Sequence, residues 1–222
     1  MSNRTFSILA ITYNKMHPFV VEIKKQKILP LYSHQDTEVL IQVISACYHE
    51  GIRFFELTNR TANASDVFKS LKSHCISHFP DLKLGVGTIK NVRDAELFCS
   101  LGADFLVSPI VSIDLISYTK SNSVFWIPGC ATPSEVGLAE TNEIELVKIF
   151  PANLIGGLGF IKTMKEIFPM MQFLATGGIN GDKEEINSWL MAGATAVGLG
   201  SSLFGKELPD FDKIASILKA NK

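Results

Sequence analysis

The sequence predicts an α/β fold, a (β/α)8 TIM barrel preceded by a helical extension. Eight short apolar runs rich in branched and aromatic residues recur about every 20 to 30 residues, the spacing of strand–helix units with buried parallel strands. Between them, apolar residues fall at helical spacing, as in Val39, Val43, Ile44 and Cys47. An open doubly wound sheet uses the same units. The count of eight and the polar residues at the carboxyl ends of several runs favour a closed barrel.

The predicted units follow one another without a break. We expect strands over residues 27–32, 53–58, 83–88, 104–108, 124–128, 145–150, 171–176 and 195–199. Gly51, Gly102 and Gly193 each follow a predicted helix and precede a strand, where a helix C-terminus favours a residue that tolerates positive φ. Because no linker or low-complexity run interrupts residues 26–222, we expect a single barrel domain there.

Residues 1–25 form the predicted extension. Phe19, Val20 and Ile23 lie at helical spacing after Pro18. We therefore expect a helix that packs on the barrel and covers its bottom.

The composition indicates a small-molecule partner. The 222 residues include 21 Lys and Arg and 22 Asp and Glu, a formal charge of −1. This balance argues against a basic surface for nucleic acid or for an acidic membrane. With 46% apolar and 19% charged residues, the chain is apolar enough to bury further surface in an oligomer.

The cysteines and the first residues predict a cytoplasmic location. Cys47, Cys75, Cys99 and Cys130 form no C-x-x-C pair and have no histidine at zinc-site spacing, so we expect reduced, mostly packed thiols. The apolar stretch over residues 6–11 is too short to span a bilayer, and no small-residue cleavage site follows it.

Lys148 is the first candidate for chemistry, because it lies inside the apolar run 145–150. Burial of an ammonium group is costly, and removal from water favours the neutral amine, which is the form that attacks a ketone. A lysine that reaches solvent from the strand end, or that pairs with a carboxylate, would explain the same pattern. A partner residue is needed to separate these interpretations.

Glu56 is the candidate partner. Side chains alternate across a strand, so Glu56 lies on the face opposite to Phe55 and Leu57. If those two residues pack on the helices, Glu56 points into the barrel, where a dry environment raises the pKa of a carboxyl and suits it to proton transfer. A purely structural ion pair with Lys148 or Arg60 remains an alternative.

Small residues end several of the predicted strands. Gly85-Val86-Gly87-Thr88 would let a ligand approach the backbone, and Ser108-Pro109 ends the next strand, although both can be simple turns. Thr176-Gly177-Gly178-Ile179 and Gly198-Leu199-Gly200-Ser201-Ser202 follow the last two strands, where the loops of many barrels bind phosphate through backbone N–H groups. Tight turns with close helix packing are the alternative.

Two other pairs are interpreted as structural. His74 and His78 stand four residues apart on a predicted helix, but no acidic or cysteine partner at a strand end accompanies them, so we expect a solvated helix face and no metal. Trp126 and Trp189 are expected to pack in the core.

Four phrases carry a family resemblance: residues 50–61, Gly85-Val86-Gly87-Thr88, Val147-Lys148-Ile149-Phe150-Pro151-Ala152 and Thr176-Gly177-Gly178-Ile179. Together they resemble the 2-keto-3-deoxy-6-phosphogluconate (KDPG) aldolase family, which includes 4-hydroxy-2-oxoglutarate (KHG) aldolase activity. The resemblance runs in order from about Ile28 to Lys219.

The resemblance implies a role for each site residue. It makes Lys148 the Schiff-base lysine and Glu56 the acid–base group, and it places Arg60 and Thr88 at the carboxylate end of the substrate. It assigns the apolar walls of the pocket to Pro109 and Phe150, and the substrate-binding loops after the last two strands to Thr176, Gly177, Gly178, Gly200 and Ser201. It implies neither a metal nor a cofactor.

The implied activity is that of a class I aldolase, a lyase that cleaves KDPG to pyruvate and glyceraldehyde 3-phosphate, with cleavage of KHG to pyruvate and glyoxylate as a further activity. The resemblance also implies a homotrimer and a place in the Entner–Doudoroff pathway of carbohydrate metabolism. Three alternatives stay open: an aldolase for a related 2-keto-3-deoxy sugar acid, a phosphosugar isomerase or epimerase, and a noncatalytic barrel that binds a phosphosugar.

Three features depart from the family's pattern. Asn153 stands where many members have Glu, Ile110 follows Ser108-Pro109 where Gly is frequent, and the leading segment through Lys25 is longer than usual. None of them involves the lysine or its glutamate. They bear on the specificity for the aldehyde side of the substrate and on subunit contacts.

Overall fold

The computed structural model describes residues 16–205 and 209–222, in which strands and helices alternate. The strands are β1 (Ile28–Tyr32), β2 (Phe54–Thr58), β3 (Lys83–Gly87), β4 (Leu106–Val107), β5 (Trp126–Ile127), β6 (Gly129–Cys130), β7 (Leu146–Ile149), β8 (Gln172–Thr176) and β9 (Ala196–Leu199). The helices are α1 (Pro18–Gln26), α2 (Thr37–His49), α3 (Ala64–His78), α4 (Val92–Ser100), α5 (Ile113–Ser121), α6 (Pro133–Thr141), α7 (Gly157–Ile167), α8 (Lys183–Met191), α9 (Ser201–Phe204) and α10 (Phe211–Ala220).

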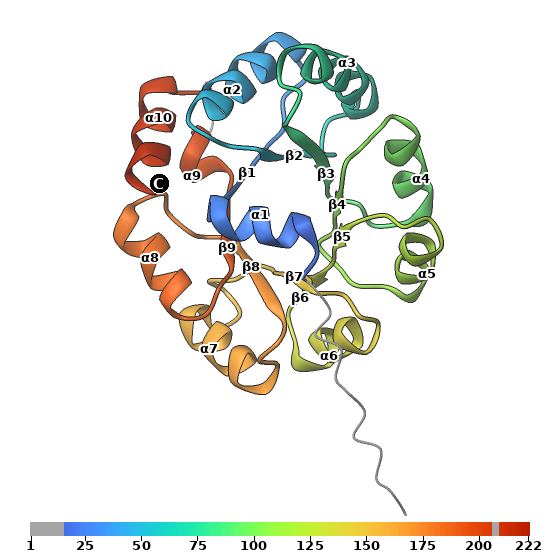
Figure 1. Ribbon diagram of the computed structural model, residues 1–222, viewed down its shortest axis with the longest axis vertical. Coiled ribbons are helices and arrows are strands. Elements are labelled where there is room, and N and C mark those ends of the chain that lie inside the picture. Colours follow the sequence, from blue (N-terminus) through green and yellow to red (C-terminus); the bar gives the residue numbers. More distant parts are fainter. Residues whose placement is uncertain (1–15, 206–208) are drawn as a thin grey trace, which may run out of the picture.

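The strands form one parallel sheet that closes into a barrel with helices around it (Figure 1). Their order is β5-β4-β3-β2-β1-β9-β8-β7-β6. β5 and β6 stand at opposite ends of this order, but only Pro128 separates them in the chain. The sheet therefore closes through this segment, and the predicted TIM barrel is confirmed.

The fifth predicted strand is divided in two by a proline. Residues 124–128 contribute Trp126–Ile127, and Gly129–Cys130 continues the same segment along β7. Proline has no N–H to donate to a strand ladder, which explains the break at Pro128. The Pro128 carbonyl still accepts a hydrogen bond from the Lys148 N–H at 2.7 Å, so β7 remains attached there.

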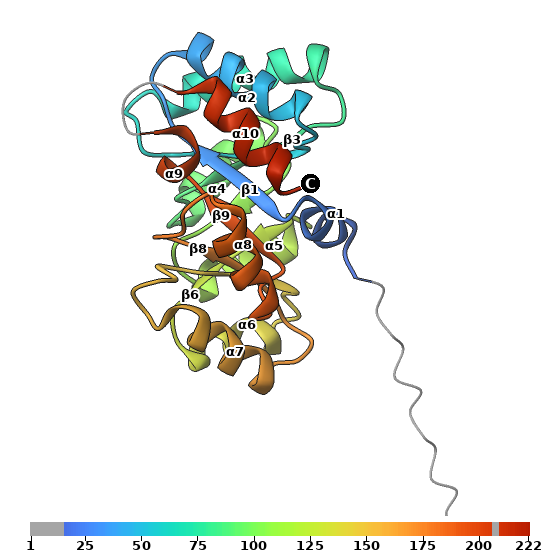
Figure 2. The ribbon, with the colours of Figure 1, turned by 90° about the vertical axis from the view of Figure 1, so that its left-hand side faces the viewer.

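Helix α1 covers the amino-terminal end of the barrel, as the spacing of its apolar residues predicted. In Figure 1 it crosses the centre of the ring, and Figure 2 shows it at the end where β1 begins. Pro18 occupies its first turn, and His17 Nδ1 accepts a hydrogen bond from the Phe19 N–H at 3.1 Å. Val20 and Ile23 are buried in the apolar cluster inside the barrel. The first fifteen residues of the predicted extension lie outside the described residues.

Other structural predictions are also confirmed. Gly51, Gly102 and Gly193, each predicted to follow a helix, have φ angles of 95°, 89° and 110°. Trp126 and Trp189 are buried in the core.

His74 and His78 lie on α3 with their rings stacked, the centroids 4.0 Å apart. Among the described residues, no group of three or more His, Cys, Asp or Glu is placed to hold a metal ion. All four cysteines are free thiols. Within the same described ranges, every helix is too short or too polar to cross a membrane.

Candidate active site

Alternation along β2 directs Glu56 into the barrel. Phe55 and Leu57 pack outward, in the apolar cluster between the strands and the helices. Phe54 packs in the separate cluster inside the barrel, and Glu56 shares its face. The carboxylate is fully buried, with 0% of the residue exposed. The predicted inward orientation of Glu56 is therefore confirmed.

Lys148 reaches the same interior from β7. Its neighbours Val147 and Ile149 belong to the outer cluster, whereas Leu146 belongs to the inner one. The side chain of Lys148 is 6% exposed, and its Nζ lies 3.9 Å from Glu56 Oε1. This separation is at the outer limit of an ion pair and beyond that of a hydrogen bond. The two predicted groups thus face each other in a nearly dry space.

The Glu56 carboxylate is unusually free of protein partners. Neither Oε1 nor Oε2 has a hydrogen-bond partner within the described residues, although both are buried. Buried polar groups are nearly always hydrogen-bonded, so the exception suggests a group reserved for a ligand or water. Burial raises the pKa of the Glu56 carboxyl, and the positive charges of Lys148 and Arg60 oppose this shift. A carboxyl with a raised pKa can both accept and return a proton near neutral pH.

Two glycines of β3 have a different role from the one suggested by the sequence. We expected Gly85 and Gly87 to let a ligand approach the backbone. A Cβ added to Gly85 would instead overlap the ring of Phe105, and one added to Gly87 would overlap the carboxylate of Glu56. The space beside these glycines is therefore filled by protein, because the inward side chains of the neighbouring strands need it.

Arg60 and Thr88 lie together at the carboxyl ends of β2 and β3. Arg60 Nε and Thr88 Oγ1 are 3.4 Å apart, and the Arg60 side chain is exposed at the rim. Thr88 has a φ of 65°, a conformation that is uncommon for a threonine and typical of functional sites when a non-glycine residue adopts it. This pair can offer a forked donor and a hydroxyl to a carboxylate.

Phe150 and Pro109, the predicted apolar walls, are both close to the lysine. The Phe150 ring centroid lies 5.2 Å from Lys148 Nζ. Pro109 packs its backbone against Gly129, which pairs with Lys148 across β6 and β7. A side chain at residue 129 would overlap the Pro109 carbonyl group, so the glycine allows this loop to approach.

The loops after β8 and β9 line the same edge of the barrel. Thr176 pairs with Gly198 across these strands, and its buried Oγ1 has no hydrogen-bond partner among the described residues. Gly177 and Gly178 have φ angles of 101° and 71°. Ser201 begins α9 and is exposed. Gly200, which precedes it, packs on Leu31 of β1.

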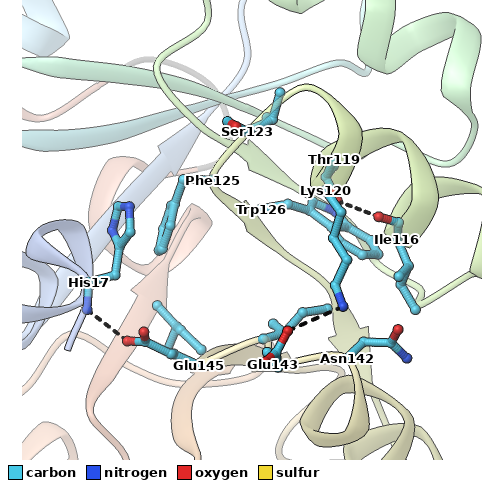
Figure 3. Close-up of a pocket in the computed structure, with 13 residues that line it drawn as sticks. His17, Ile116, Thr119, Lys120, Ser123, Phe125, Trp126, Asn142, Glu143 and Glu145 are labelled. Carbon is cyan, nitrogen blue, oxygen red and sulfur yellow. Dashed lines mark hydrogen bonds and ion pairs between the residues drawn. The ribbon is translucent and has the colours of Figure 1, made fainter. Parts of the chain in front are cut away.

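A separate cavity of about 390 Å³ lies at the opposite end of the barrel (Figure 3). It is bordered by the starts of β5 and β7 and by the ends of α5 and α6. His17 stacks on Phe125 there, and its backbone N–H donates to Glu145 Oε2 at 2.8 Å. Lys120 and Glu143 form an exposed ion pair across the opening. The cavity therefore adjoins the attachment of α1 and not the Lys148 site.

Two contacts at the site were not foreseen. Trp126 Nε1 donates to Ser108 Oγ at 2.7 Å, so a packing residue of β5 holds the hydroxyl that follows the neighbouring strand β4. The side chain of Asn153 lies on the α-carbon of Gly178. Neither contact has a signal in the sequence spacing, because each joins loops or strands that are distant in the chain.

Comparison with known proteins gives concordant matches. Residues 20–218 match the family model for KDPG and KHG aldolase. The 2-dehydro-3-deoxy-phosphogluconate aldolase of Pseudoalteromonas atlantica is 31% identical over 153 residues, which cover 69% of this chain and 69% of that protein.

Solved structures resemble the barrel over most of its length. The KDPG aldolase of Zymomonas mobilis with 3-phosphoglycerate superposes with a TM-score of 0.81 at 26% identity, covering 91% of this chain and 94% of that one. The KDPG aldolase of Legionella pneumophila, with pyruvate captured as a covalent carbinolamine, has a TM-score of 0.78 at 26% identity, with coverages of 87% and 93%.

Proposed function

Because this chain belongs to the KDPG and KHG aldolase family, we propose that it is a class I aldolase in which Lys148 forms a Schiff base with a 2-keto acid. The neutral amine of Lys148 attacks C2 of the substrate and gives a carbinolamine. Loss of water then gives an iminium, which can accept the electron pair of a breaking carbon–carbon bond. The carbinolamine captured in the Legionella pneumophila enzyme is the corresponding adduct in a related protein.

Glu56 is the proton carrier in this proposal. It removes the proton of the C4 hydroxyl, directly or through a water, while the C3–C4 bond breaks. The hydroxyl oxygen becomes the carbonyl of the released aldehyde, and the electron pair passes into the iminium to give an enamine. Glu56 then returns its proton to C3, and water hydrolyses the new iminium to release pyruvate and regenerate Lys148.

The observation that carries the proposal is the meeting of Lys148 and Glu56 inside the barrel. Their nearest polar atoms are 3.9 Å apart, and the carboxylate oxygens have no other partner among the described residues. A structural ion pair would favour closer, hydrogen-bonded geometry with its remaining lone pairs satisfied. The space between an amine and an unbonded carboxylate suits a reaction that needs both a nucleophile and a proton carrier.

We assign the preferred substrate as KDPG, which yields glyceraldehyde 3-phosphate as the second product. Arg60 and Thr88 would hold the carboxylate of the keto acid, while Pro109 and Phe150 would enclose its carbon chain. Thr176 and the backbone of the two glycine-containing loops, Gly177, Gly178, Gly200 and Ser201, would hold the terminal phosphate. KHG, which yields glyoxylate, is the second substrate to be tested.

The decisive experiment is reduction with borohydride in the presence of pyruvate, followed by mass spectrometry. Reduction converts the iminium into a stable secondary amine, so we expect one adduct on the peptide that contains Lys148 and none in Lys148→Ala. Unmodified wild-type protein would overturn the proposal. Sugar-phosphate isomerase activity without an adduct would favour an isomerase or epimerase, and affinity for a phosphosugar without turnover would favour a noncatalytic barrel.

The proposed assembly is a homotrimer. Several large apolar side chains are exposed on the isolated chain, among them Leu154 at 79%, Met170 at 74% and Met191 at 88%. Contact with another subunit would remove such apolar side chains from water, which is favourable. Light scattering at micromolar concentration tests the proposal, and a monomeric mass would contradict it.

The proposed location is the cytoplasm, where thiols stay reduced. The four free cysteines support this, since secreted proteins usually oxidise theirs to disulfides. Fractionation of cells that produce the protein tests it, and recovery outside the cytoplasm would contradict it.

A further inference from the structure

Leu31 is an interior residue at the carboxyl end of β1. Alternation along the strand places it on the same face as Leu29, which belongs to the apolar cluster inside the barrel. Leu29 is 0% exposed, whereas Leu31 is only partly buried. Because Leu31 lies one layer nearer to the carboxyl end of the barrel, its exposed part borders the space that contains Lys148 and Glu56.

Two glycines of β9 and the loop after it hold the Leu31 side chain in place. A Cβ added to Gly198 would lie 3.2 Å from Leu31 Cδ2, and one added to Gly200 would lie 3.1 Å from Leu31 Cδ1. Both methyl groups therefore rest on glycine backbone, where a larger residue would crowd them. They cannot withdraw in this direction, so a ligand that reaches Leu31 meets an apolar wall that does not yield.

Glu56 stands beside Leu31 and leans the other way. The two residues are paired in the register of β1 and β2, so their side chains are neighbours on the inner face of the barrel. The Glu56 carboxylate lies over Gly87 of β3, on the side away from β1. The two side chains thus diverge, and a group that lies between them can reach the methyl groups of one and the carboxylate of the other.

The strand order places Leu31 beneath the middle of the proposed substrate. In the order β3-β2-β1-β9-β8, β1 separates the strands that lead to Arg60 and Thr88 from those that lead into the glycine loops (Figure 1). The proposed function puts the carboxylate of the keto acid at the former and its far end at the latter. Lys148 Nζ lies 3.9 Å from Glu56 Oε1, so C2 is held beside β2, and the chain that continues from it passes over β1. The first carbon on this path is C3.

We propose that Leu31 is a specificity-determining residue that packs against C3 of the bound keto acid and excludes acids with a further carbon on C3. This inference rests on the proposed aldolase function. A C3 atom that bears only hydrogens fits between Leu31 and Glu56, whereas an added methyl group meets the side chain that Gly198 and Gly200 hold in place. Discrimination by one such carbon in an apolar pocket is about tenfold or more.

The test uses the exchange of C3 hydrogens with solvent deuterium, which needs no aldehyde. In this reaction Lys148 forms the iminium, Glu56 takes a proton from C3 to give the enamine, and a deuteron from D2O returns to C3 by the same route. The two acids are pyruvate and 2-oxobutanoate, which carries one more methyl group on C3. Proton NMR in D2O measures the ratio of kcat/KM for 2-oxobutanoate to kcat/KM for pyruvate.

We expect Leu31→Ala to raise this ratio about tenfold or more over the wild-type value, because truncation opens room for the added methyl group. Leu29→Ala is the matched control, since it removes the same atoms from the same face of β1 one layer deeper, and it should leave the ratio unchanged. Circular dichroism checks that the variants are folded. If Leu31→Ala does not fold, Leu31→Val, which should raise the ratio to a smaller extent, decides by the same criterion.

An unchanged ratio in Leu31→Ala would overturn the inference, because Leu31 would then not limit the size of C3. An equal rise in Leu29→Ala would also overturn it, because any loosening of β1 would then have the same effect. Wild-type protein that forms the borohydride adduct with pyruvate but exchanges both acids equally well would overturn the inference and leave the aldolase proposal standing. Wild-type protein that traps no pyruvate would overturn both.

Discussion

Glu56 and Gly87 share one space: the Glu56 carboxylate lies where a side chain at residue 87 would begin. Gly87 is on β3, beside β2, and it pairs with Thr58, two residues beyond Glu56. The glycine thus decides where the carboxylate lies relative to Lys148.

Gly87→Ala should displace Glu56 and lower kcat/KM about a hundredfold, the loss typical of a catalytic group moved by about 1 Å. The barrel should remain folded, because only one methyl group is added. Gly159→Ala is the matched control, since a Cβ at Gly159 meets no atom within 4 Å. Steady-state kinetics and circular dichroism test both variants. Equal activity of the two would contradict the steric role of Gly87.

Glu56→Gln should separate the two halves of the proposed mechanism. The amide keeps the size of the carboxyl but cannot carry the proton, so we expect kcat to fall about 10²- to 10⁴-fold. The reduced adduct of Lys148 with pyruvate should still form, because the amine is intact. Mass spectrometry and cleavage assays on one preparation test this. Lys148→Ala is the control that should lose both the pyruvate adduct and the cleavage activity. Wild-type turnover by Glu56→Gln would exclude Glu56 as the proton carrier.

The pH profile should show an acid limb from Glu56. Burial raises the pKa of its carboxyl above the ordinary value of about 4.3, while Lys148 and Arg60 oppose the shift. As a base the carboxylate must be ionised, so kcat/KM should fall as the pH drops through this raised pKa. Arg60→Met removes an opposing charge and should move the limb to higher pH, whereas Arg60→Lys should not. If the acid limbs of Arg60→Met and Arg60→Lys fell at the same pH, the assignment of this limb to Glu56 would be wrong.

Ile23→Ala should destabilise the protein through α1. Ile23 is 1% exposed and packs inside the end of the barrel, so its truncation should lower the free energy of unfolding by about 2–5 kcal/mol. Ile76→Ala makes the same change at a residue that is 65% exposed on α3 and should cost no more than about 0.5 kcal/mol. Urea denaturation measures both. Similar losses would show that α1 does not depend on this packing.

Gln26→Leu should weaken the attachment of β1 to β2, which the side chain of Gln26 bridges by hydrogen bonds. Gln26 Nε2 donates to the carbonyls of Ile28 and Phe54 at 2.7 and 2.9 Å, and its Oε1 accepts from the N–H groups of Arg53 and Phe54 at 2.6 and 2.9 Å. Loss of these partners should lower the free energy of unfolding by about 1–3 kcal/mol or more. Gln35→Leu, at an exposed position, is the control, and denaturation that does not distinguish the two would contradict the bridging role.

Local sequence patterns were sufficient to predict the barrel fold and to select Glu56 and Lys148 as candidates for its interior. Alternation in 53–58 predicted that Glu56 faces inward if Phe55 and Leu57 pack on the helices. The apolar residues around Lys148 were consistent with its burial but also with a side chain that reaches solvent. For Gly85 and Gly87 the sequence predicted room for a ligand, but side chains of the protein fill that space. Which group lies beside a glycine depends on the neighbouring strands, and local patterns do not contain this information.

The sequence by itself determined the alternation of strands and helices and which faces of the strands are inside, because these depend on periodicity within about ten residues. Only the tertiary structure decided that Glu56 meets Lys148 at 3.9 Å, that Pro128 divides the strand that closes the barrel, and that Asn153 lies on Gly178. Those relationships join residues far apart in the chain. They follow from strand register and barrel closure, which all of the strands determine together through their packing.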